Sequence, residues 1–396
     1  MHAANTHLKL QYEGSVKRVF APHADAQRLW FEFTDDYSVF DWGKMPETIA
    51  NKGRALTVLG AAFFTRLADP ILWKNLSSSK NFSGLDQQWL NTMWSSPTYA
   101  RLVREGLKSH YYQLNSQSEE TLPLGEAARH QGPVYMSVMK ADVHHPEPAV
   151  VLGQTVYHYP SVPVDSVRRL VPLEVVFRFG MPAGSSLQDR LEKNPAYAKA
   201  LGLNTLPSEG SWFPHPVLEF FTKLEPKDRL LSLSEAMLIS GLSLHQFETM
   251  ADISLLVSLA LFDVFGTAGI ELWDGKFEFI LDGDQILLAD SIGPDELRLI
   301  YKGLHLSKEI IRQVYRGGEW EQSLKRSQQL AAERQVHDWK SICKNELQSA
   351  PANLPANFKA AIDHMYPVLA NTVAGEKLFE DQPDLDGLVA KLNAAK

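Results

Sequence analysis

The stretch LWDGKFEFILDGDQILLADSIGPDELR, residues 272–298, carries the strongest local signal for the fold. Two apolar runs flank Asp282-Gly283-Asp284, a pattern that is typical of a β-hairpin. Side chains alternate between the two faces of a strand, so Asp274, Lys276 and Glu278 share one face. Phe277 and Phe279 share the other. The sequence therefore predicts a hairpin with one polar and one apolar face.

The length of the turn decides whether the acidic side chains of this hairpin meet. If residues 282–284 form a three-residue loop, Leu281 pairs with Gln285, and Asp290 lies across from the lysine and on the same side as Glu278. A two-residue turn shifts the register by one and puts Asp290 on the opposite face. Two carboxylates and an ammonium group on one face suit a magnesium-nucleotide, and an ordinary solvated hairpin face is the alternative.

Size and composition describe a globular protein. The chain has 396 residues, 44% of them hydrophobic and 22% charged, enough for two domains or one large enzyme core. Its net charge of -8 argues against non-specific nucleic-acid binding. The N-terminus lacks a signal pattern, and no uninterrupted apolar run approaches the roughly 18 residues that span a bilayer. The single Cys343 excludes an internal disulfide, so a reducing, cytoplasmic location without a membrane partner is expected.

The N-terminal segment offers a simple phosphate-binding pattern. Residues 8–20 read as two strands joined at Glu13-Gly14-Ser15, with Lys17 just after the turn. A glycine turn lets backbone amides approach phosphate oxygens, and the lysine adds charge, but many such turns bind nothing. Neither the P-loop nor the dinucleotide fingerprint occurs in the sequence.

The rest of the chain alternates strand and helix patterns. We expect a strand over 28–40, a helix from Pro46 to Leu67, an inserted surface segment near 71–100, strands over 134–143 and 149–159, a linker at 160–163, and a capped amphipathic helix from Ser243 to Phe265.

One apolar strand, Leu170 to Arg178, carries two charged side chains. Burying the charges of Glu174 and Arg178 inside such a run costs free energy unless they are paired or used in binding. They therefore form either a structural ion pair or part of a site. Further along, Lys308 and Arg312 are four residues apart and share one face of a predicted helix.

Together, these fragments resemble the phosphoribosylaminoimidazole-succinocarboxamide synthase (SAICAR synthetase) family over most of residues 8–316. The matching pieces occur in the family's order: Tyr12-Glu13-Gly14 with Lys17, Asp36 with Ser38, Lys52-Gly53, residues 171–176 with Arg178, Gly184-Ser185, Lys223, residues 274–279, Leu288-Ala289-Asp290, and Pro294-Asp295 with Arg298.

The resemblance implies an α+β, two-lobed fold with a kinase-like ATP cleft. It would comprise an antiparallel β-rich N-terminal lobe over 1–172, an α+β catalytic lobe over 173–317 and a helical C-terminal extension over 318–396. The implied reaction joins L-aspartate to carboxyaminoimidazole ribonucleotide (CAIR), using ATP and Mg²⁺ and passing through an acyl phosphate. The oligomeric state stays open.

The resemblance also implies roles for particular residues. Gly14 and Lys17 would hold ATP phosphates, Glu174 would meet the adenine edge, and Lys223 would lie at the nucleotide. The remaining roles are the following: Glu278 and Asp290 as magnesium ligands, Lys276 beside the transferring phosphoryl group, and Arg178, Ser185, Arg298, Arg312 and the nearby Lys308 at the phosphate and carboxylate of the ribonucleotide.

Three serines depart from the family pattern. Ser15 replaces a usual lysine, Ser291 replaces an acidic residue, and Ser307 replaces a frequent aspartate, whereas the residues with implied catalytic roles are kept. An active ligase is the favoured interpretation. The alternatives are a small-molecule kinase of related fold and a catalytically weakened nucleotide-binding relative.

Overall fold

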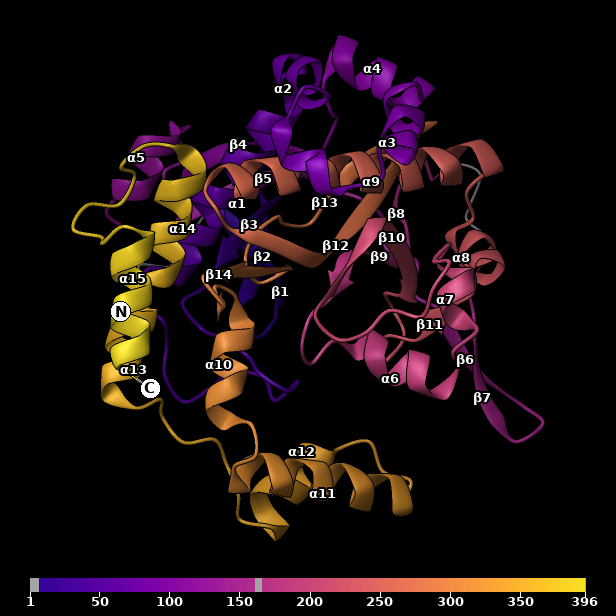
Figure 1. The fold of residues 1–396 in the computed structure, drawn as a ribbon. Coiled ribbons are helices and arrows are strands. Elements are labelled where there is room, and N and C mark those ends of the chain that lie inside the picture. Colours follow the sequence, from indigo (N-terminus) through magenta and orange to yellow (C-terminus); the bar gives the residue numbers. More distant parts are fainter. Residues whose placement is uncertain (1–6, 161–165, 396) are drawn as a thin grey trace.

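The computed structural model describes residues 7–160 and 166–395, and its first layer is a five-stranded antiparallel sheet (Figure 1). The strand order is β1 (Leu8–Glu13), β2 (Lys17–Pro22), β3 (Arg28–Phe33), β5 (Val134–Met139) and β4 (Tyr111–Ser116). Helix α1 (Lys52–Ala68) packs on this sheet. A Cβ on Gly53 would come within 2.2 Å of the Phe33 carbonyl oxygen, so only glycine permits this close contact between helix and strand.

The second sheet is built around the long strand β12 (Glu271–Asp282). Its main path runs β11 (Leu230–Leu231), β10 (Ser211–Thr222), β9 (Leu173–Met181), β12, β14 (Leu297–Tyr301) and β15 (Leu304–His305). The far end of β12 pairs with β8 (Arg168–Leu170) and β13 (Gln285–Ala289). Strand β12 therefore has a hydrogen-bonded neighbour on each edge, which fixes the side chains on its polar face.

Helix α9 (Leu244–Thr267) covers this sheet on one side (Figure 1). The Ser243 hydroxyl accepts a hydrogen bond from Gln246 N–H, and the Gln246 side-chain oxygen accepts one from the Ser243 backbone N–H, so the predicted capping box is confirmed. By length and composition alone this helix could cross a membrane, but 61% of its most apolar 18-residue stretch is buried inside the protein. Its apolar character is explained by packing on both sides.

The segment near 71–100 is more than a surface insertion, because it forms the layer that covers the outer side of α9. Trp73 in this layer is fully buried. The elements are α2 (Pro70–Leu76), the 3₁₀ turn η1 (Lys80–Gly84), α3 (Gln87–Trp94) and α4 (Pro97–Glu105).

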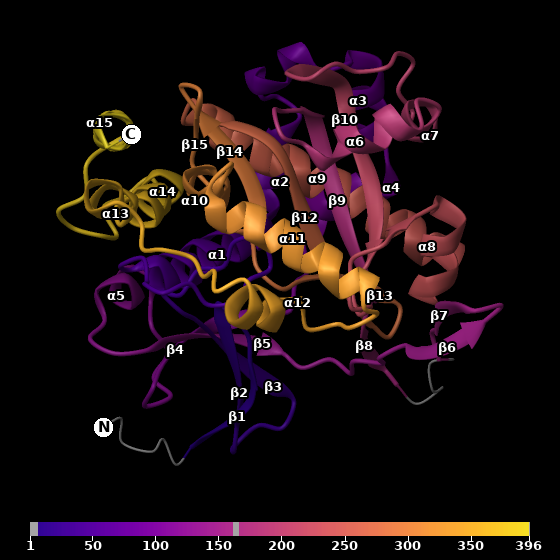
Figure 2. The ribbon, with the colours of Figure 1, turned by 90° about the horizontal axis from the view of Figure 1, so that it is seen from below.

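The C-terminal region is helical, as predicted, and part of it packs against the N-terminal half of the chain (Figure 2). Helix α14 (Met365–Ala374) lies on α1, and Trp42 contacts Trp320 and Trp339. The elements of this region are α10 (Lys308–Tyr315), α11 (Glu319–Glu333), α12 (Trp339–Ser341), the π-helical turn η2 (Ile342–Glu346), α13 (Ala356–Ile362), α14 and α15 (Leu385–Ala394).

The predicted α+β fold class is confirmed, with local differences. The strand expected over 28–40 ends at Phe33, and the run from 149 belongs to a separate hairpin of β6 (Glu147–Val151) and β7 (Gln154–His158). Most of the expected linker at 160–163 lies outside the described residues. The remaining elements are α5 (Leu124–Arg129), α6 (Ser186–Lys193), α7 (Tyr197–Ala200) and α8 (Leu233–Ser240).

Candidate active site

The central hairpin has the shorter of the two turns that the sequence allows. Asp282 pairs with Gln285, so Gly283 and the residue after it form a two-residue turn, and Gly283 adopts a positive φ of 57°. Glu278 pairs with Ala289. In a regular strand, the next residue, Asp290, would therefore point to the face opposite Glu278.

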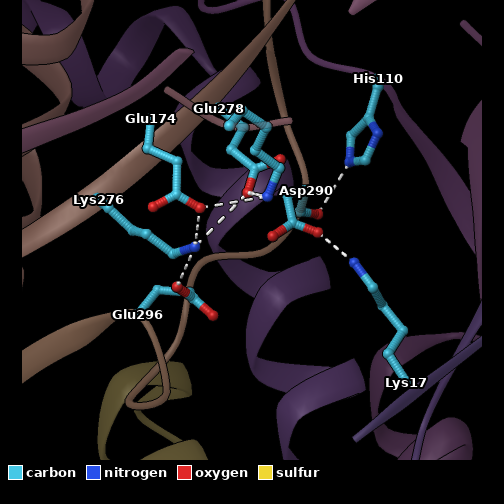
Figure 3. Close-up of polar contacts among 8 residues, drawn as sticks. Lys17, His110, Glu174, Lys276, Glu278, Asp290 and Glu296 are labelled. Carbon is cyan, nitrogen blue, oxygen red and sulfur yellow. Dashed lines mark hydrogen bonds and ion pairs between the residues drawn. The ribbon is translucent and has the colours of Figure 1, made fainter. Parts of the chain in front are cut away.

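A backbone turn at Asp290 nevertheless brings the two carboxylates together. Strand β13 ends at Ala289, and Asp290 has a φ of 63°, in the left-handed region. This conformation costs a non-glycine residue about 1–2 kcal/mol, and short polar side chains such as aspartate adopt it most readily. As a result, the Asp290 carboxylate points toward Glu278 (Figure 3).

The register of β9, β12 and β14 arranges the other charges in two groups. Asp274 lies between Arg178 on β9 and Arg298 on β14, and Lys276 is opposite Val176. Continuing this register puts Glu174 beside Glu278. The polar face of β12 thus has arginines beside Asp274 at one end and carboxylates at Glu278, about 13 Å further along the strand, with Lys276 between them.

Lysines neutralise the carboxylate end of this face (Figure 3). The Nζ of Lys276 lies 2.7 Å from Glu174 Oε1, 3.3 Å from Glu296 Oε2 and 3.6 Å from Glu278 Oε1. Lys223, just after β10, donates to Glu278, and its Nζ is 3.2 Å from Glu174 Oε1.

The first sheet also contributes to the site. Lys17, which begins β2, donates to the Asp290 carboxylate, and the Gly14 backbone N–H donates to the Lys17 carbonyl at 2.9 Å. The Lys17 ammonium lies 4.5 Å from the centre of the Phe31 ring. The site therefore lies between the two sheets, and the turn at Gly14 fixes the backbone from which Lys17 projects.

Burial and charge act differently on the two central carboxylates. Burial, with repulsion from Asp290, raises the pKa of Glu278 to about 7. Burial also opposes ionisation of Asp290, but Lys17, Lys223 and Lys276 outweigh it and hold the pKa of Asp290 well below its usual range. Such opposite shifts in one pair of carboxylates are typical of functional sites.

The donor set fits magnesium. Across residues 7–160 and 166–395, no group of three or more His, Cys, Asp and Glu side chains could hold a metal. Magnesium is usually bound through one or two carboxylates plus phosphate oxygens and water, and Glu278 and Asp290 are two carboxylates that could supply the protein's share of such a site.

Of the two alternatives for Glu174 and Arg178, an ion pair between them does not form. Glu174 binds the two lysines instead, while Arg178 is 5% exposed and donates to Glu219 and, at 2.9 Å, to Asp274. Arg298 has a freer guanidinium: its Nε is 3.5 Å from Asp274 Oδ1, and its Nη1 is buried without a hydrogen-bond partner. Such an unsatisfied donor is what an anionic ligand would meet.

The other predicted substrate residues lie on α6 and α10. Ser185 is buried and caps α6 by accepting a hydrogen bond from Leu187 N at 3.4 Å. Arg312 lies 3.2 Å from Glu309, which also binds Arg316 at 2.7 Å. Lys308 begins α10 and helps to lower the pKa of Asp295.

Three residues that contact the candidate site or its predicted residues were not predicted from the sequence: His110, Glu296 and Arg316. His110 Nε2 is 3.0 Å from the Asp290 carbonyl oxygen, Glu296 binds Lys276, and Arg316 shares Glu309 with Arg312. Glu296 and Arg316 are close in sequence to predicted residues, whereas nothing in the sequence around His110 indicates its contact.

Comparison with known proteins identifies the family of the chain. The SAICAR synthetase family model matches residues 10–327. A putative phosphoribosylaminoimidazole-succinocarboxamide synthase of Archaeoglobus fulgidus is 30% identical over 384 residues, which cover 96% of this chain and 98% of the relative. The phosphoribosylaminoimidazole-succinocarboxamide synthase of Thermoplasma acidophilum is 27% identical over 318 residues, which cover 78% of this chain and 84% of the relative.

Solved structures share the fold. A SAICAR synthase structure has a TM-score of 0.55 at 18% identity and covers 95% of this chain and 98% of its own. The Saccharomyces cerevisiae SAICAR synthase, solved with SAICAR, has a TM-score of 0.52 at 20% identity with the same coverage.

The family match makes this α+β protein an enzyme of the ligase class. More narrowly, the chain belongs to the SAICAR synthetase family of purine biosynthesis. The resemblance found in the sequence is thereby confirmed.

Proposed function

We propose that this chain joins the amine of L-aspartate to the carboxylate of CAIR, giving SAICAR, ADP and phosphate. The observation that carries the proposal is the convergence of Glu278, Asp290 and Lys276 between the two sheets. Membership of the family supports the substrates, and the charge pattern supports the use of ATP.

The nucleotide would bind at the carboxylate end of β12. Lys17 and the turn at Gly14 would hold its phosphates, with Lys223 beside them. Glu174 would reach the adenine edge, although its contacts with Lys223 and Lys276 also make it a positioning group for both ammonium groups. A magnesium ion held by Glu278 and Asp290 would neutralise charge on the phosphate oxygens.

The arginine end of β12 would bind the ribonucleotide. Arg298 on β14 offers a buried donor without a partner among the described residues. Arg178 lies on the other side of Asp274, on β9. The residues on α6 and α10 that would complete this anion site are Ser185, Lys308 and Arg312. The spacing along β12 would then direct the carboxylate of CAIR toward Lys276.

The chemistry would proceed in two displacements. An oxygen of the CAIR carboxylate attacks the γ-phosphorus of ATP and ADP leaves, which forms an acyl phosphate. The aspartate amine then attacks the acyl carbon, phosphate leaves, and the amine nitrogen loses a proton. Phosphoryl transfer requires chiefly positioning and charge neutralisation, and Lys276 would provide positive charge beside the transferring group.

A coupled ADP-release assay tests this function. We expect ADP release at a rate that requires CAIR, ATP and L-aspartate together, and SAICAR in equal amount to ADP. Omitting each substrate in turn separates the alternatives. Rapid ADP release without aspartate would indicate a kinase, and tight nucleotide binding without phosphate release would indicate a weakened relative.

A further inference from the structure

Asp290 needs support from its surroundings to keep its left-handed backbone. Its φ of 63° is what directs the carboxylate toward Glu278, because the hairpin register alone would direct it away. A residue that stabilises this conformation therefore controls whether the two carboxylates can share one ligand. His110 makes such a contact with the Asp290 backbone.

The imidazole of His110 is held in one orientation. The residue is 2% exposed, and its ring packs against Phe31 and Phe64, with ring centres 5.8 Å and 5.4 Å away. Its own backbone is fixed too: its N–H donates to the Leu288 carbonyl at 2.9 Å, and its carbonyl accepts from Met139 N at 2.7 Å. The ring therefore has little freedom to move away from its contact.

That contact is a hydrogen bond to the main chain of Asp290. His110 Nε2 lies 3.0 Å from the Asp290 carbonyl oxygen (Figure 3). A carbonyl oxygen can only accept, so Nε2 must carry the hydrogen. The bond anchors the peptide group that follows Asp290, while Lys17 binds the carboxylate. Asp290 is thus held at its backbone and at its side chain.

We propose that His110 is a positioning residue that fixes Asp290 in the left-handed conformation required for binding a divalent cation with Glu278. This inference rests on the proposed role of Asp290 as a metal ligand. His110 does not touch substrate or metal in this scheme, and its imidazole acts only through the Asp290 backbone, as residues beside metal ligands commonly do.

The inference can be tested without turnover by measuring Mn²⁺ affinity. Electron paramagnetic resonance would report Mn²⁺ binding in the presence of a non-hydrolysable ATP analogue. His110→Phe keeps an aromatic ring against Phe31 and Phe64 but removes the donor, and we expect about tenfold weaker Mn²⁺ binding. His110→Gln can donate from a similar position and should restore affinity to within about threefold. Binding of CAIR without metal should be unchanged in both.

Two controls separate the possible failures. His215→Phe changes a histidine stacked on Trp89, outside the cluster, and should leave Mn²⁺ affinity unchanged. Asp290→Asn should abolish tight Mn²⁺ binding. If it does not, the proposed metal site is wrong. If Asp290→Asn abolishes binding but His110→Phe does not weaken it, the positioning role is wrong and the metal site stands.

A measurement on the unmodified protein guards against a variant that fails to fold. In protein labelled with ¹⁵N-histidine, His110 should show the tautomer with hydrogen on Nε2. Hydrogen on Nδ1 alone would overturn the inference, because no donor would then face the Asp290 carbonyl oxygen.

Discussion

Asp290 shows how a single backbone torsion can decide the composition of a site. The family resemblance implies that Glu278 and Asp290 meet with Lys276 nearby, but the hairpin pattern alone leaves the turn length open. A left-handed residue after β13 compensates for the shifted register, and hydrophobic alternation contains no signal for such a residue. Partners on distant elements, such as His110, are likewise set by tertiary packing rather than by local sequence.

Lys276 provides the most direct test of the proposed chemistry. Its ammonium lies among three carboxylates, which outweigh burial and raise its pKa, so it stays charged throughout the working range of pH. We expect Lys276→Gln to lower kcat by about 10²- to 10³-fold, because a preorganised charge beside the transferring group is lost.

Steady-state kinetics with CAIR and aspartate would measure this loss. Lys302→Gln is the matched control, since Lys302 pairs with Asp386 on the surface, and its kcat should stay unchanged. A kcat near that of the unmodified protein in Lys276→Gln would contradict the assignment.

Arg298 tests the proposed position of the ribonucleotide. Its buried Nη1 has no hydrogen-bond partner among residues 7–160 and 166–395, so truncation removes a donor that binding would use. We expect Arg298→Ala to raise the KM for CAIR by about 10- to 100-fold, the loss of a charge-assisted hydrogen bond, while affinity for an ATP analogue is kept.

The measurement pairs CAIR kinetics with calorimetric binding of the ATP analogue. Arg334→Ala, which removes a surface partner of Glu346, should alter neither quantity. Weaker nucleotide binding with an unchanged KM for CAIR would reverse the proposed positions of the two substrates.

At the scale of elements, the sequence predicts what local chemistry determines. The capping box at Ser243 and the glycine turn after β1 follow from short patterns, and both occur in the structure. The segment near 71–100 was harder to predict, because its helices are short and are stabilised by packing on α9 rather than by strong periodicity. Tertiary contacts thus supply what its sequence pattern lacks.

The capping box of α9 gives a prediction at this scale. Ser243→Ala should reduce the free energy of unfolding by about 1 kcal/mol, because the Gln246 N–H loses its side-chain acceptor at the helix start. Urea denaturation followed by circular dichroism would measure it. Ser243→Asp should retain most of the stability, and equal losses in both variants would show that the cap is not responsible.

At the scale of the whole molecule, one charged group joins the beginning and end of the chain. Asp295 follows the central hairpin, lies 2.8 Å from the fully buried Lys52 of α1, and accepts a hydrogen bond from the Tyr366 hydroxyl of α14 at 2.7 Å. The C-terminal region is thereby tied to the N-terminal helix and to the loop that leads to Arg298.

This link predicts a pH-dependent contribution to stability. Burial opposes ionisation of Asp295, but Lys52 and Lys308 outweigh it and lower the pKa of Asp295. A carboxyl whose pKa is lower in the folded protein stabilises it above its unfolded pKa of about 3.9, and this effect is lost as pH falls through the folded value. Asp295→Asn should therefore cost about 3–5 kcal/mol at pH 7, where it leaves Lys52 buried and unpaired.

Urea unfolding at pH 7 and at lower pH would measure the free energy of unfolding of Asp295→Asn and of the unmodified protein, and the comparison is the difference between these two values. The difference should shrink below about pH 4. Asp386→Asn breaks the exposed pair with Lys302, and its effect should remain below about 1 kcal/mol. A difference for Asp295→Asn that grows in acid would contradict the assigned direction.

The ion pairs around Lys276 have a further consequence for which form of the nucleotide can enter. Glu174, Glu278 and Glu296 surround this lysine, and Lys17 is already engaged by Asp290. Uncomplexed ATP, with its full negative charge, would find little spare positive potential here, whereas chelation by a divalent cation offsets the repulsion from the carboxylates. Surplus free ATP should accordingly compete only weakly with its magnesium chelate, so the enzyme should tolerate shifts in the ratio of magnesium to nucleotide.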